Sequence, residues 1–292
     1  SQAQIKFAPF QDLTRAFSIK VSTSARIHVN PATRSELVTI VNICHNLGIR
    51  YVIIGNGTKI LPPDGMINAV VITLDSDHWK SLEWIENDTL RCMGGTSLRD
   101  FCKSVSEKGF LGTEKLSYIP SHMGGAILMN AGAHGQTISD HLVSIETLDP
   151  DGVIRTLEKV NLSFGYRMAS IPHNNVVLSA TFRFSERAPQ EYFTSMAEEL
   201  LNWRKMHQPK GINFGSVFKN GNDFCAGELI DRAGLKGTSI GGAAISKEHA
   251  NFIINRGDAS FQDIEKLIDL ARYTVYMKFG KFLRTEVNIL RA

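Results

Sequence analysis

The stretch from residue 119 to residue 135 reads IPSHMGGAILMNAGAHG. It contains four glycines, three alanines and one asparagine, and it carries almost no charge. Side chains this small and apolar solvate poorly and leave the backbone open to close approach by a ligand. We therefore expect the stretch to line a large, flat ligand. A glycine-rich loop between packed strands is the alternative.

A shorter glycine motif, Gly55-Asn-Gly-Thr58, lies upstream, directly after the apolar run at residues 51–54. Glycines at the end of a strand let successive backbone N–H groups form a concavity that suits a phosphate. The spacing matches neither the G-x-G-x-x-G fingerprint nor a P-loop. A phosphate site and a simple tight turn are equally good interpretations of this motif alone.

Three further motifs carry polar side chains. The arginine of Phe164-Gly-Tyr-Arg167 has a planar fork that fits a carboxylate or phosphate, although a surface arginine is the commoner interpretation. Gly215-Ser-Val-Phe-Lys-Asn220 combines a hydroxyl, an ammonium and an amide that could donate a proton and hold a pyrophosphate. A turn capped by Ser216 is the alternative. Glu286 is a lone carboxylate in a terminal strand, and a lone glutamate is usually solvated.

Helical and strand-like periodicity alternate along the chain. The expected strands are residues 25–29, 51–54, 142–148, 153–157 and 176–184. The expected helices follow the capping residues Thr33 and Ser97, run through Met196–Trp203 and Phe224–Ala233, and span Ser260–Tyr276. Helices mixed with antiparallel hairpins are typical of an α+β fold. We expect three parts, residues 1–73, 74–186 and 187–292.

Composition and charge limit the function. The chain has 43% hydrophobic and 21% charged residues, as in an ordinary globular protein. Its formal net charge of +3 argues against a dedicated nucleic-acid binder but suits phosphorylated ligands. No apolar run approaches the roughly 20 residues of a membrane helix, and the start lacks a secretory pattern. We expect a cytoplasmic protein that binds neither nucleic acid nor membrane.

Cysteine and histidine spacing indicates neither disulfides nor a metal centre. The four cysteines contain no Cys-x-x-Cys pair, and we expect reduced core thiols at Cys44, Cys92, Cys102 and Cys225. The histidines lack metal-ligand spacing with a cysteine or a carboxylate pair, so we expect no metal site. The chain also lacks a Gly-x-Ser-x-Gly elbow, which argues against Ser216 as a triad nucleophile.

Taken together, the order and separation of these motifs resemble the UDP-N-acetylenolpyruvoylglucosamine reductase (MurB) family. The resemblance extends from about residue 10 to about residue 290. Its most specific pieces are residues 129–135, 215–220 and 247–253. The third part shows no extended extra loop, which is typical of the shorter of the family's two types.

The resemblance implies an FAD-binding fold of the vanillyl-alcohol-oxidase type in two lobes, followed by a C-terminal α+β substrate-binding domain. FAD would lie between the first two lobes. The residues implied at FAD are Gly55, Asn56, Gly57 and Thr58 at its pyrophosphate and Ile119, Pro120, Ser121, Gly124, Gly125, Asn130, Ala131, Gly132 and Gly135 along the flavin.

The same resemblance implies reduction of UDP-N-acetylglucosamine enolpyruvate to UDP-N-acetylmuramate by FAD and NADPH, a step of peptidoglycan precursor synthesis. Arg167, Ser216 and Glu286 fall on the family's catalytic positions. Arg167 and a protonated Glu286 would stabilise the charge that builds beside the substrate carboxylate, and Ser216 would donate a proton to the adjacent carbon. The implied substrate-binding residues are Tyr166, Lys219 and Asn220. A monomer with this UDP-sugar as its small-molecule partner is expected.

This chain departs from the family pattern in the flavin half. A usual Gly-Gly after the first strand is replaced in the segment Val21–Ala25, and the usual Ser-Asn after the glycines is Thr58-Lys59. The usual Gly-Ile-Pro-Gly-Thr is here Tyr118–His122, and His134 stands where a tyrosine is usual. We expect altered contacts to FAD. A drifted flavin- or UDP-sugar-binding relative, with another oxidoreductase activity or none, is the alternative.

Overall fold

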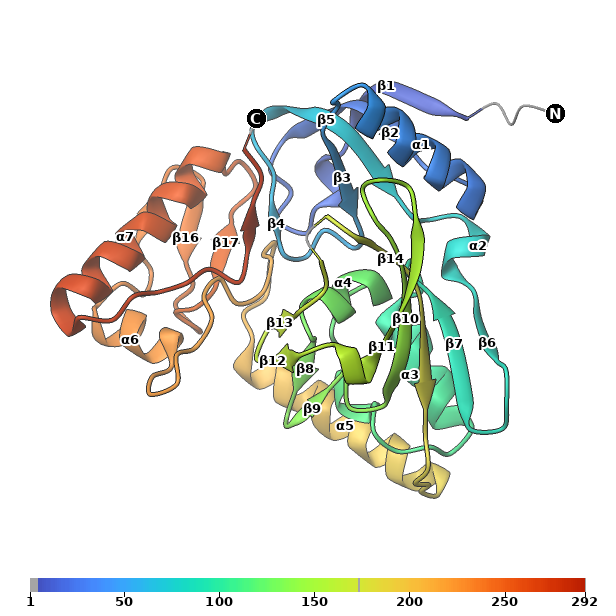
Figure 1. Ribbon diagram of the computed structural model, residues 1–292. Coiled ribbons are helices and arrows are strands. Elements are labelled where there is room, and N and C mark those ends of the chain that lie inside the picture. The colour runs from blue at the N-terminus through green and yellow to red at the C-terminus, as the bar shows by residue number, and fades with distance from the viewer. Residues whose placement is uncertain (1–4, 173, 292) are drawn as a thin grey trace. The chain divides into compact units, whose positions relative to one another are not determined.

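The computed structural model describes residues 5–172 and 174–291. The chain divides into two compact units (Figure 1). Unit 1 comprises the chain up to Pro9, Ile27–Gly55 and Ala69–Asn202. Unit 2 comprises Phe10–Arg26, Asn56–Asn68 and the chain from Trp203 onward. The division into three parts, residues 1–73, 74–186 and 187–292, stays a prediction. Residues 1–4, 173 and 292 of these parts lie outside the described residues.

The centre of unit 1 is a five-stranded antiparallel sheet. Its order is β11 (Ile154–Glu158), β10 (Leu142–Leu148), β14 (Val176–Arg183), β7 (Thr89–Met93) and β6 (Leu82–Trp84). The expected hairpin and the following strand are therefore confirmed. The apolar run of β14 arises because this strand is buried on both faces.

Residues of β14 belong to two hydrophobic clusters. Val176 and Leu178 pack with α1 (Arg34–Asn46). Val177 and Ala180 pack with α3 (Leu98–Glu107) and α4 (Met123–Leu128), which Figure 1 shows beside this sheet. Residues 178 and 180 would normally face the same side of β14, because side chains alternate along a strand. A bulge in β14 opposite Glu146 and Thr147 reverses this alternation, so the two residues face different clusters.

The two predicted helix starts in unit 1 are confirmed. Thr33 Oγ1 accepts a hydrogen bond from the Glu36 N–H at 3.2 Å, and Ser97 Oγ accepts one from the Asp100 N–H at 3.0 Å. In a regular capping box, the Glu36 carboxylate would accept a hydrogen bond from the N–H of the N-cap residue, Thr33. Here it accepts one from the N–H of the preceding residue, Ala32, at 2.8 Å. Both helices end before a glycine with positive φ, Gly48 or Gly109.

A second sheet has the order β1 (Phe7–Asp12), β2 (Thr23–Val29), β5 (Gly65–Thr73) and β3 (Tyr51–Ile54). In unit 1, β3 pairs in parallel with residues 70–73 of β5. The β-α-β order expected for this region is thereby confirmed. Ile54 is the one fully buried residue of β3, and its other three side chains are half-buried.

Shorter elements complete the described part of unit 1. They are α2 (Asp77–Lys80), β8 (Gly132–Ala133), β9 (Gln136–Thr137), β12 (Phe164–Gly165), β13 (Met168–Ala169) and the 3-10 turns Glu114–Leu116 and Lys159–Asn161. Helix α5 (Gln190–His207) begins in unit 1 and ends in unit 2. The Tyr118 hydroxyl donates to the Ala197 carbonyl at 3.1 Å and ties α5 to the start of the glycine-rich stretch.

Unit 2 is built around a three-stranded antiparallel sheet and one long helix. The sheet order is β15 (Ser239–Ile240), β16 (Ala243–Ile245) and β17 (Ile253–Asn255). Helix α7 (Phe261–Phe279) packs against β15, β16 and α6 (Ala226–Arg232). The apolar residues that helical spacing places on one face of α7 are all buried, namely Ile264, Leu267, Ile268, Ala271 and Val275. The remaining elements are the 3-10 turn Thr14–Ala16 and the parallel pair β4 (Ile60–Leu61) and β18 (Asn288–Ile289).

The prediction of four core cysteines is wrong for one of them. Cys44, Cys92 and Cys102 are buried, and burial raises the pKa of the Cys102 thiol to about 12. Cys225 is exposed, because it occupies the N-cap position of α6 and lies outside the apolar face of that helix. Within residues 5–172 and 174–291, no helix combines the length and apolar character needed to cross a membrane.

Glu146 on β10 is the centre of a charged cluster in unit 1. Its carboxylate accepts two hydrogen bonds from Arg34, at 2.8 and 3.3 Å, and also contacts Arg91 and Ser179. Burial by itself raises the pKa of Glu146, but these hydrogen bonds and the charges of both arginines outweigh it and lower the pKa to about 2.

Glu146→Gln is expected to lower the free energy of unfolding at pH 7 by about 2 kcal/mol, a value discounted for partial exposure. A depressed folded-state pKa stabilises the fold above the ordinary value of 4.5, and this contribution is lost as pH falls toward about 2. Urea unfolding at pH 7 and pH 3 should show the difference between wild type and Glu146→Gln shrinking at acid pH. A difference that stays constant with pH would contradict the assignment. Glu158→Gln, at an exposed carboxylate on β11, is the control.

Candidate functional site

The glycine-rich stretch of residues 119–135 folds around α4 in unit 1. Met123, Ala126 and Ile127 are completely buried in the cluster beneath the five-stranded sheet. The apolar half of the stretch therefore belongs to the core, which residue composition alone did not indicate. Among the predicted cofactor residues, Pro120, Gly125 and Gly135 are exposed, Ile119, Ser121, Gly124 and Gly132 are half-buried, and Asn130 and Ala131 are buried.

Asn130 carries an acceptor without a protein partner. Its Nδ2 donates to the Gly165 carbonyl at 3.0 Å, whereas its buried Oδ1 has no hydrogen-bond partner. The backbone of Asn130 has a left-handed φ of +40°, an uncommon conformation outside glycine. An unmet buried acceptor costs free energy unless a donor reaches it. The N–H groups of a flavin ring are donors of this kind, so the stretch fits the group that the sequence implies.

Gly55 and His122 lie together in unit 1. A Cβ on Gly55 would lie 3.4 Å from the Cβ of His122, so the end of β3 closely approaches the start of α4. Burial lowers the pKa of His122, outweighing the opposing charge of Asp75, so its imidazole is neutral at pH 7. The two predicted cofactor segments thus meet at this point, beside the neutral imidazole ring of His122.

Tyr166 and Arg167 form the two-residue tip of the hairpin between β12 and β13. Arg167 has a φ of +53°, which is strained for a non-glycine residue. Its guanidinium carbon lies 5.2 Å from the centre of the Tyr166 ring. One guanidinium nitrogen lies 3.6 Å from the point that a Cβ on Gly132 would occupy. Unit 1 therefore brings the predicted catalytic arginine to the glycine-rich stretch.

The rest of the predicted phosphate loop, residues 56–58, belongs to unit 2. Gly57 has a φ of +58°, and a Cβ at this position would overlap the carbonyl oxygen of Ala16. The Ser18 N–H donates to the Gly57 carbonyl at 3.2 Å. Gly57 is therefore required both by its left-handed backbone and by the close approach of a second chain segment.

The segment containing Ser216 lies between two others in unit 2. On one side, the Val217 N–H donates to the Asn251 carbonyl at 2.8 Å. The Asn251 side chain also accepts from the Phe218 N–H and donates to the Phe218 carbonyl, both at 2.9 Å. On the other side, the Glu286 N–H donates to the Val217 carbonyl at 2.8 Å. Asn251 belongs to the motif at residues 247–253, but its side-chain hydrogen bonds to the Phe218 backbone were not predicted.

Lys219 and Asn220 continue this segment. The Lys219 N–H donates to the Arg284 carbonyl at 2.9 Å, and the Lys219 side chain is half-buried. Asn220 Oδ1 accepts from the Ala226 N–H at 2.9 Å and so helps to begin α6. The Asn220 amide thus has a structural contact in addition to the substrate contact that its motif implies.

Glu286 is not the solvated carboxylate that a lone glutamate suggests. Its side chain is 7% exposed, and its Oε1 lies 3.1 Å from Lys59 Nζ. The same ammonium donates to the Ser216 carbonyl at 2.6 Å. The sequence identified Thr58-Lys59 as a departure from the family pattern, but no local signal connected Lys59 with Glu286 or with the Ser216 segment.

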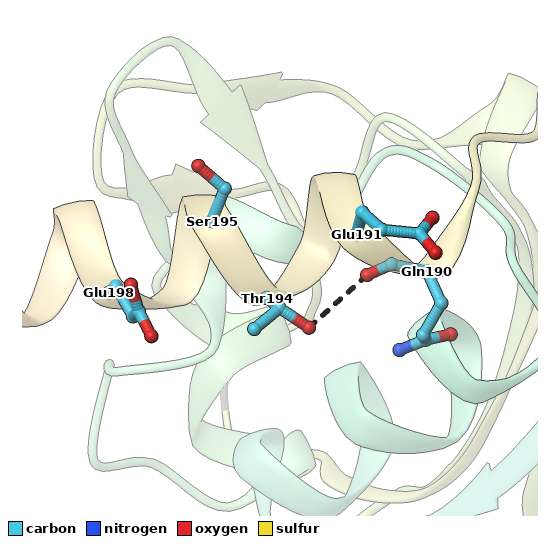
Figure 2. A pocket seen from close by; sticks show the side chains of 5 residues that line it. All are labelled: Gln190, Glu191, Thr194, Ser195 and Glu198. Atoms are coloured by element: carbon cyan, nitrogen blue, oxygen red, sulfur yellow. Dashed lines mark hydrogen bonds between the residues drawn. The ribbon is translucent and has the colours of Figure 1, made fainter.

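A hollow on the surface of α5 lies elsewhere. Gln190, Glu191, Thr194, Ser195 and Glu198 line it, all from successive turns of one helix (Figure 2). The Thr194 hydroxyl donates to the Gln190 carbonyl at 3.3 Å, as an exposed helical threonine commonly does. None of the predicted site residues contributes to this hollow, and we assign it no chemistry. In the part of the chain that the structure describes, no three His, Cys, Asp or Glu side chains are grouped to hold a metal ion.

Comparisons with known proteins match both halves of the chain. A family model of the FAD binding domain matches residues 25–158, and a model of the C-terminal domain of UDP-N-acetylenolpyruvoylglucosamine reductase matches residues 207–290. A UDP-N-acetylenolpyruvoylglucosamine reductase from Clostridioides difficile (strain 630) is 36% identical, covering 96% of this chain and 92% of the relative. One from Synechococcus sp. (strain JA-3-3Ab) is 34% identical, covering 99% and 91%.

A solved structure matches over the same length. The crystal structure of UDP-N-acetylenolpyruvylglucosamine reductase from Thermus caldophilus has a TM-score of 0.81 and 29% identity, and the match covers 99% of each chain. The predicted α+β fold, with an FAD-binding domain followed by a C-terminal domain, is confirmed.

Proposed function

Because this chain belongs to the UDP-N-acetylenolpyruvoylglucosamine reductase family, we propose that it reduces UDP-N-acetylglucosamine enolpyruvate to UDP-N-acetylmuramate in peptidoglycan precursor synthesis. The observation that carries the proposal is the 36% identity over 96% of the chain to a relative of that name. The FAD-binding model and the C-terminal model of the family also match separate parts of the chain, residues 25–158 and 207–290.

We propose that residues 55–58 and 119–135 hold FAD. The unmet acceptor of Asn130, the close approach of Gly55 to His122 and the left-handed Gly57 support this assignment. When bound, FAD supplies the hydride chemistry of the reduction, with NADPH as the proposed source of electrons. The residues of the chain then bind the substrate, place its charge and provide the proton.

Each proposed catalytic residue has a role that its chemistry supports. Arg167 would pair with the substrate carboxylate, beside which negative charge develops during reduction, because its planar fork matches a carboxylate. Glu286 would help to stabilise the same developing negative charge. Ser216 would donate its hydroxyl proton to the adjacent carbon, which becomes basic enough to take it. Tyr166, Lys219 and Asn220 are the proposed substrate-binding residues.

The proposal extends to the organisation of the chain. Residues 1–73 and 74–186 would form the two lobes that hold FAD, and residues 187–292 would form the substrate domain. The match of the FAD model to residues 25–158 and of the C-terminal model to 207–290 supports this order. We propose a monomer that works in the cytoplasm, where NADPH and UDP-sugars are available.

A visible absorption spectrum of the purified protein tests the function. We expect oxidised flavin bands that bleach with anaerobic NADPH and return when the enolpyruvyl UDP-sugar is added. Bleaching that oxygen alone reverses would indicate a different oxidoreductase. A protein that shows no flavin bands, even after incubation with FAD, would contradict the proposed enzyme.

A further inference from the structure

We infer that Lys59 is a positioning residue, which holds Glu286 and the Ser216 backbone in place with one ammonium group. The inference rests on the proposed function, because it concerns residues proposed to act in the reaction. Its basis is a set of contacts within unit 2.

Three segments far apart in the sequence meet at Lys59. Strand β4 begins at the next residue and pairs in parallel with β18, where the Asn288 N–H donates to the Lys59 carbonyl at 2.8 Å. The segment around Glu286 is in turn hydrogen-bonded to the segment around Ser216 through the Glu286 N–H and the Val217 carbonyl. These backbone pairings therefore place the Lys59 side chain beside both proposed catalytic residues of unit 2, Ser216 and Glu286.

The side-chain contacts then connect all three segments. Lys59 Nζ lies 3.1 Å from Glu286 Oε1 and 2.6 Å from the Ser216 carbonyl oxygen. Gly215 makes room for the ammonium, because a Cβ there would lie 3.3 Å from Lys59 Nζ. Gly215 also has a φ of +74°, which disfavours a larger residue at this position.

The energetics favour a positioning role over an incidental surface contact. The Glu286 side chain is 7% exposed, and a buried carboxyl group needs a hydrogen-bond donor to offset its lost hydration, which the Lys59 ammonium supplies. Charge-assisted hydrogen bonds are shorter and stronger than neutral ones, so they restrict the orientation of the groups that they join. Since Lys59 bonds the backbone of Ser216 directly, its removal would release both Glu286 and the residue that carries the proposed proton donor.

Lys59→Met removes the ammonium and keeps much of the side-chain volume. We expect sugar-dependent reoxidation of the NADPH-reduced enzyme at saturating sugar to slow roughly 10- to 100-fold, as misplacement of catalytic groups commonly causes. Reduction by NADPH, FAD content and the sugar dissociation constant should change less than about threefold. Lys59→Arg, which keeps the charge, should recover part of the lost rate. Lys236→Met removes the exposed Lys236–Asp231 pair of the same unit and is the control.

A double-mutant cycle with Glu286→Gln shows whether Lys59 acts through Glu286. In the purified holoenzyme, each single substitution should lower Tm by roughly 2–4 °C, and the double substitution should lower it less than their sum. The reoxidation rate should show the same non-additivity. Additive effects in both measurements would overturn the inference.

Other outcomes separate this inference from the proposed function. Loss of FAD, or an equal slowing of reduction and reoxidation in Lys59→Met, would make Lys59 a cofactor or folding residue and overturn the inference. In that case, wild-type reoxidation by the sugar would still support the reductase. A wild-type protein that NADPH bleaches and the sugar does not reoxidise would reject the proposed function. The positioning role in that reaction would then be rejected with it.

Discussion

Ser216→Ala is expected to leave reduction of the bound flavin by NADPH nearly unchanged and to slow its reoxidation by the enolpyruvyl sugar by roughly 10²- to 10⁴-fold. The reason is that the second half-reaction alone needs a proton at the carbon next to the developing charge. Stopped-flow absorbance of the two half-reactions, measured separately, gives both rates.

The structure makes this substitution a clean one. The backbone carbonyl of Ser216 accepts a hydrogen bond from the Lys59 ammonium, and its backbone forms a β-bridge with Phe252. An alanine at position 216 retains both interactions, because neither uses the side chain. Loss of the hydroxyl should therefore not disturb the segment. Ser239→Ala, at an exposed serine of β15, is the matched control and should behave as wild type. Equal slowing of both half-reactions in Ser216→Ala would refute the role of proton donor.

Gly57→Ala is expected to be the most damaging small substitution in the proposed phosphate loop. A left-handed backbone costs a non-glycine residue about 1–2 kcal/mol. The added methyl group would also overlap the Ala16 carbonyl oxygen, so residues 16–18 or 56–58 must move. We expect a total loss of about 3 kcal/mol or more in the free energy of unfolding, together with a large loss of bound FAD.

Gly65→Ala separates the cost of the left-handed backbone from the cost of the overlap with the Ala16 carbonyl oxygen. Gly65 has a φ of +79°, but a Cβ there would meet nothing within 4 Å, so this variant carries the conformational cost without the overlap. Urea unfolding and the flavin-to-protein absorbance ratio should place Gly65→Ala well above Gly57→Ala in both stability and FAD content. Similar values for the two variants would mean that the contact of Gly57 with Ala16 has no energetic importance.

Local chemistry explains why many elements were predictable. Thr33 and Ser97 cap their helices through contacts three residues away, and α7 buries the side chains that its spacing predicted. Such features depend on neighbours in the chain, so periodicity and capping chemistry reveal them. Composition was a weaker guide at α4, where three side chains of the glycine-rich stretch are fully buried.

The site could be predicted as a set of residues but not as a set of contacts. The motifs by themselves left a surface arginine as the commoner interpretation of Arg167 and a capped turn as an alternative for Ser216. The resemblance assigned the catalytic roles of Arg167, Ser216 and Glu286. The strained hairpin tip at Arg167, the clamp that Asn251 makes on Phe218 and the orphaned Asn130 acceptor all depend on pairings between separate segments. Sequence spacing carries little information about such pairings, because long-range register is set by packing of the whole unit.

The sequence by itself determined the fold class, the longer helices, strands such as β3, β10 and β14, and the family through motifs spread over the chain, whereas β5, β7 and α4 were not predicted. Only the tertiary structure decided the surroundings of Glu286. Its carboxylate is buried beside the ammonium of Lys59 because β4 pairs in parallel with β18 and the Ser216 segment pairs with residues 284–287. Each pairing joins segments that are distant along the chain. Their side chains therefore become neighbours only when unit 2 has folded.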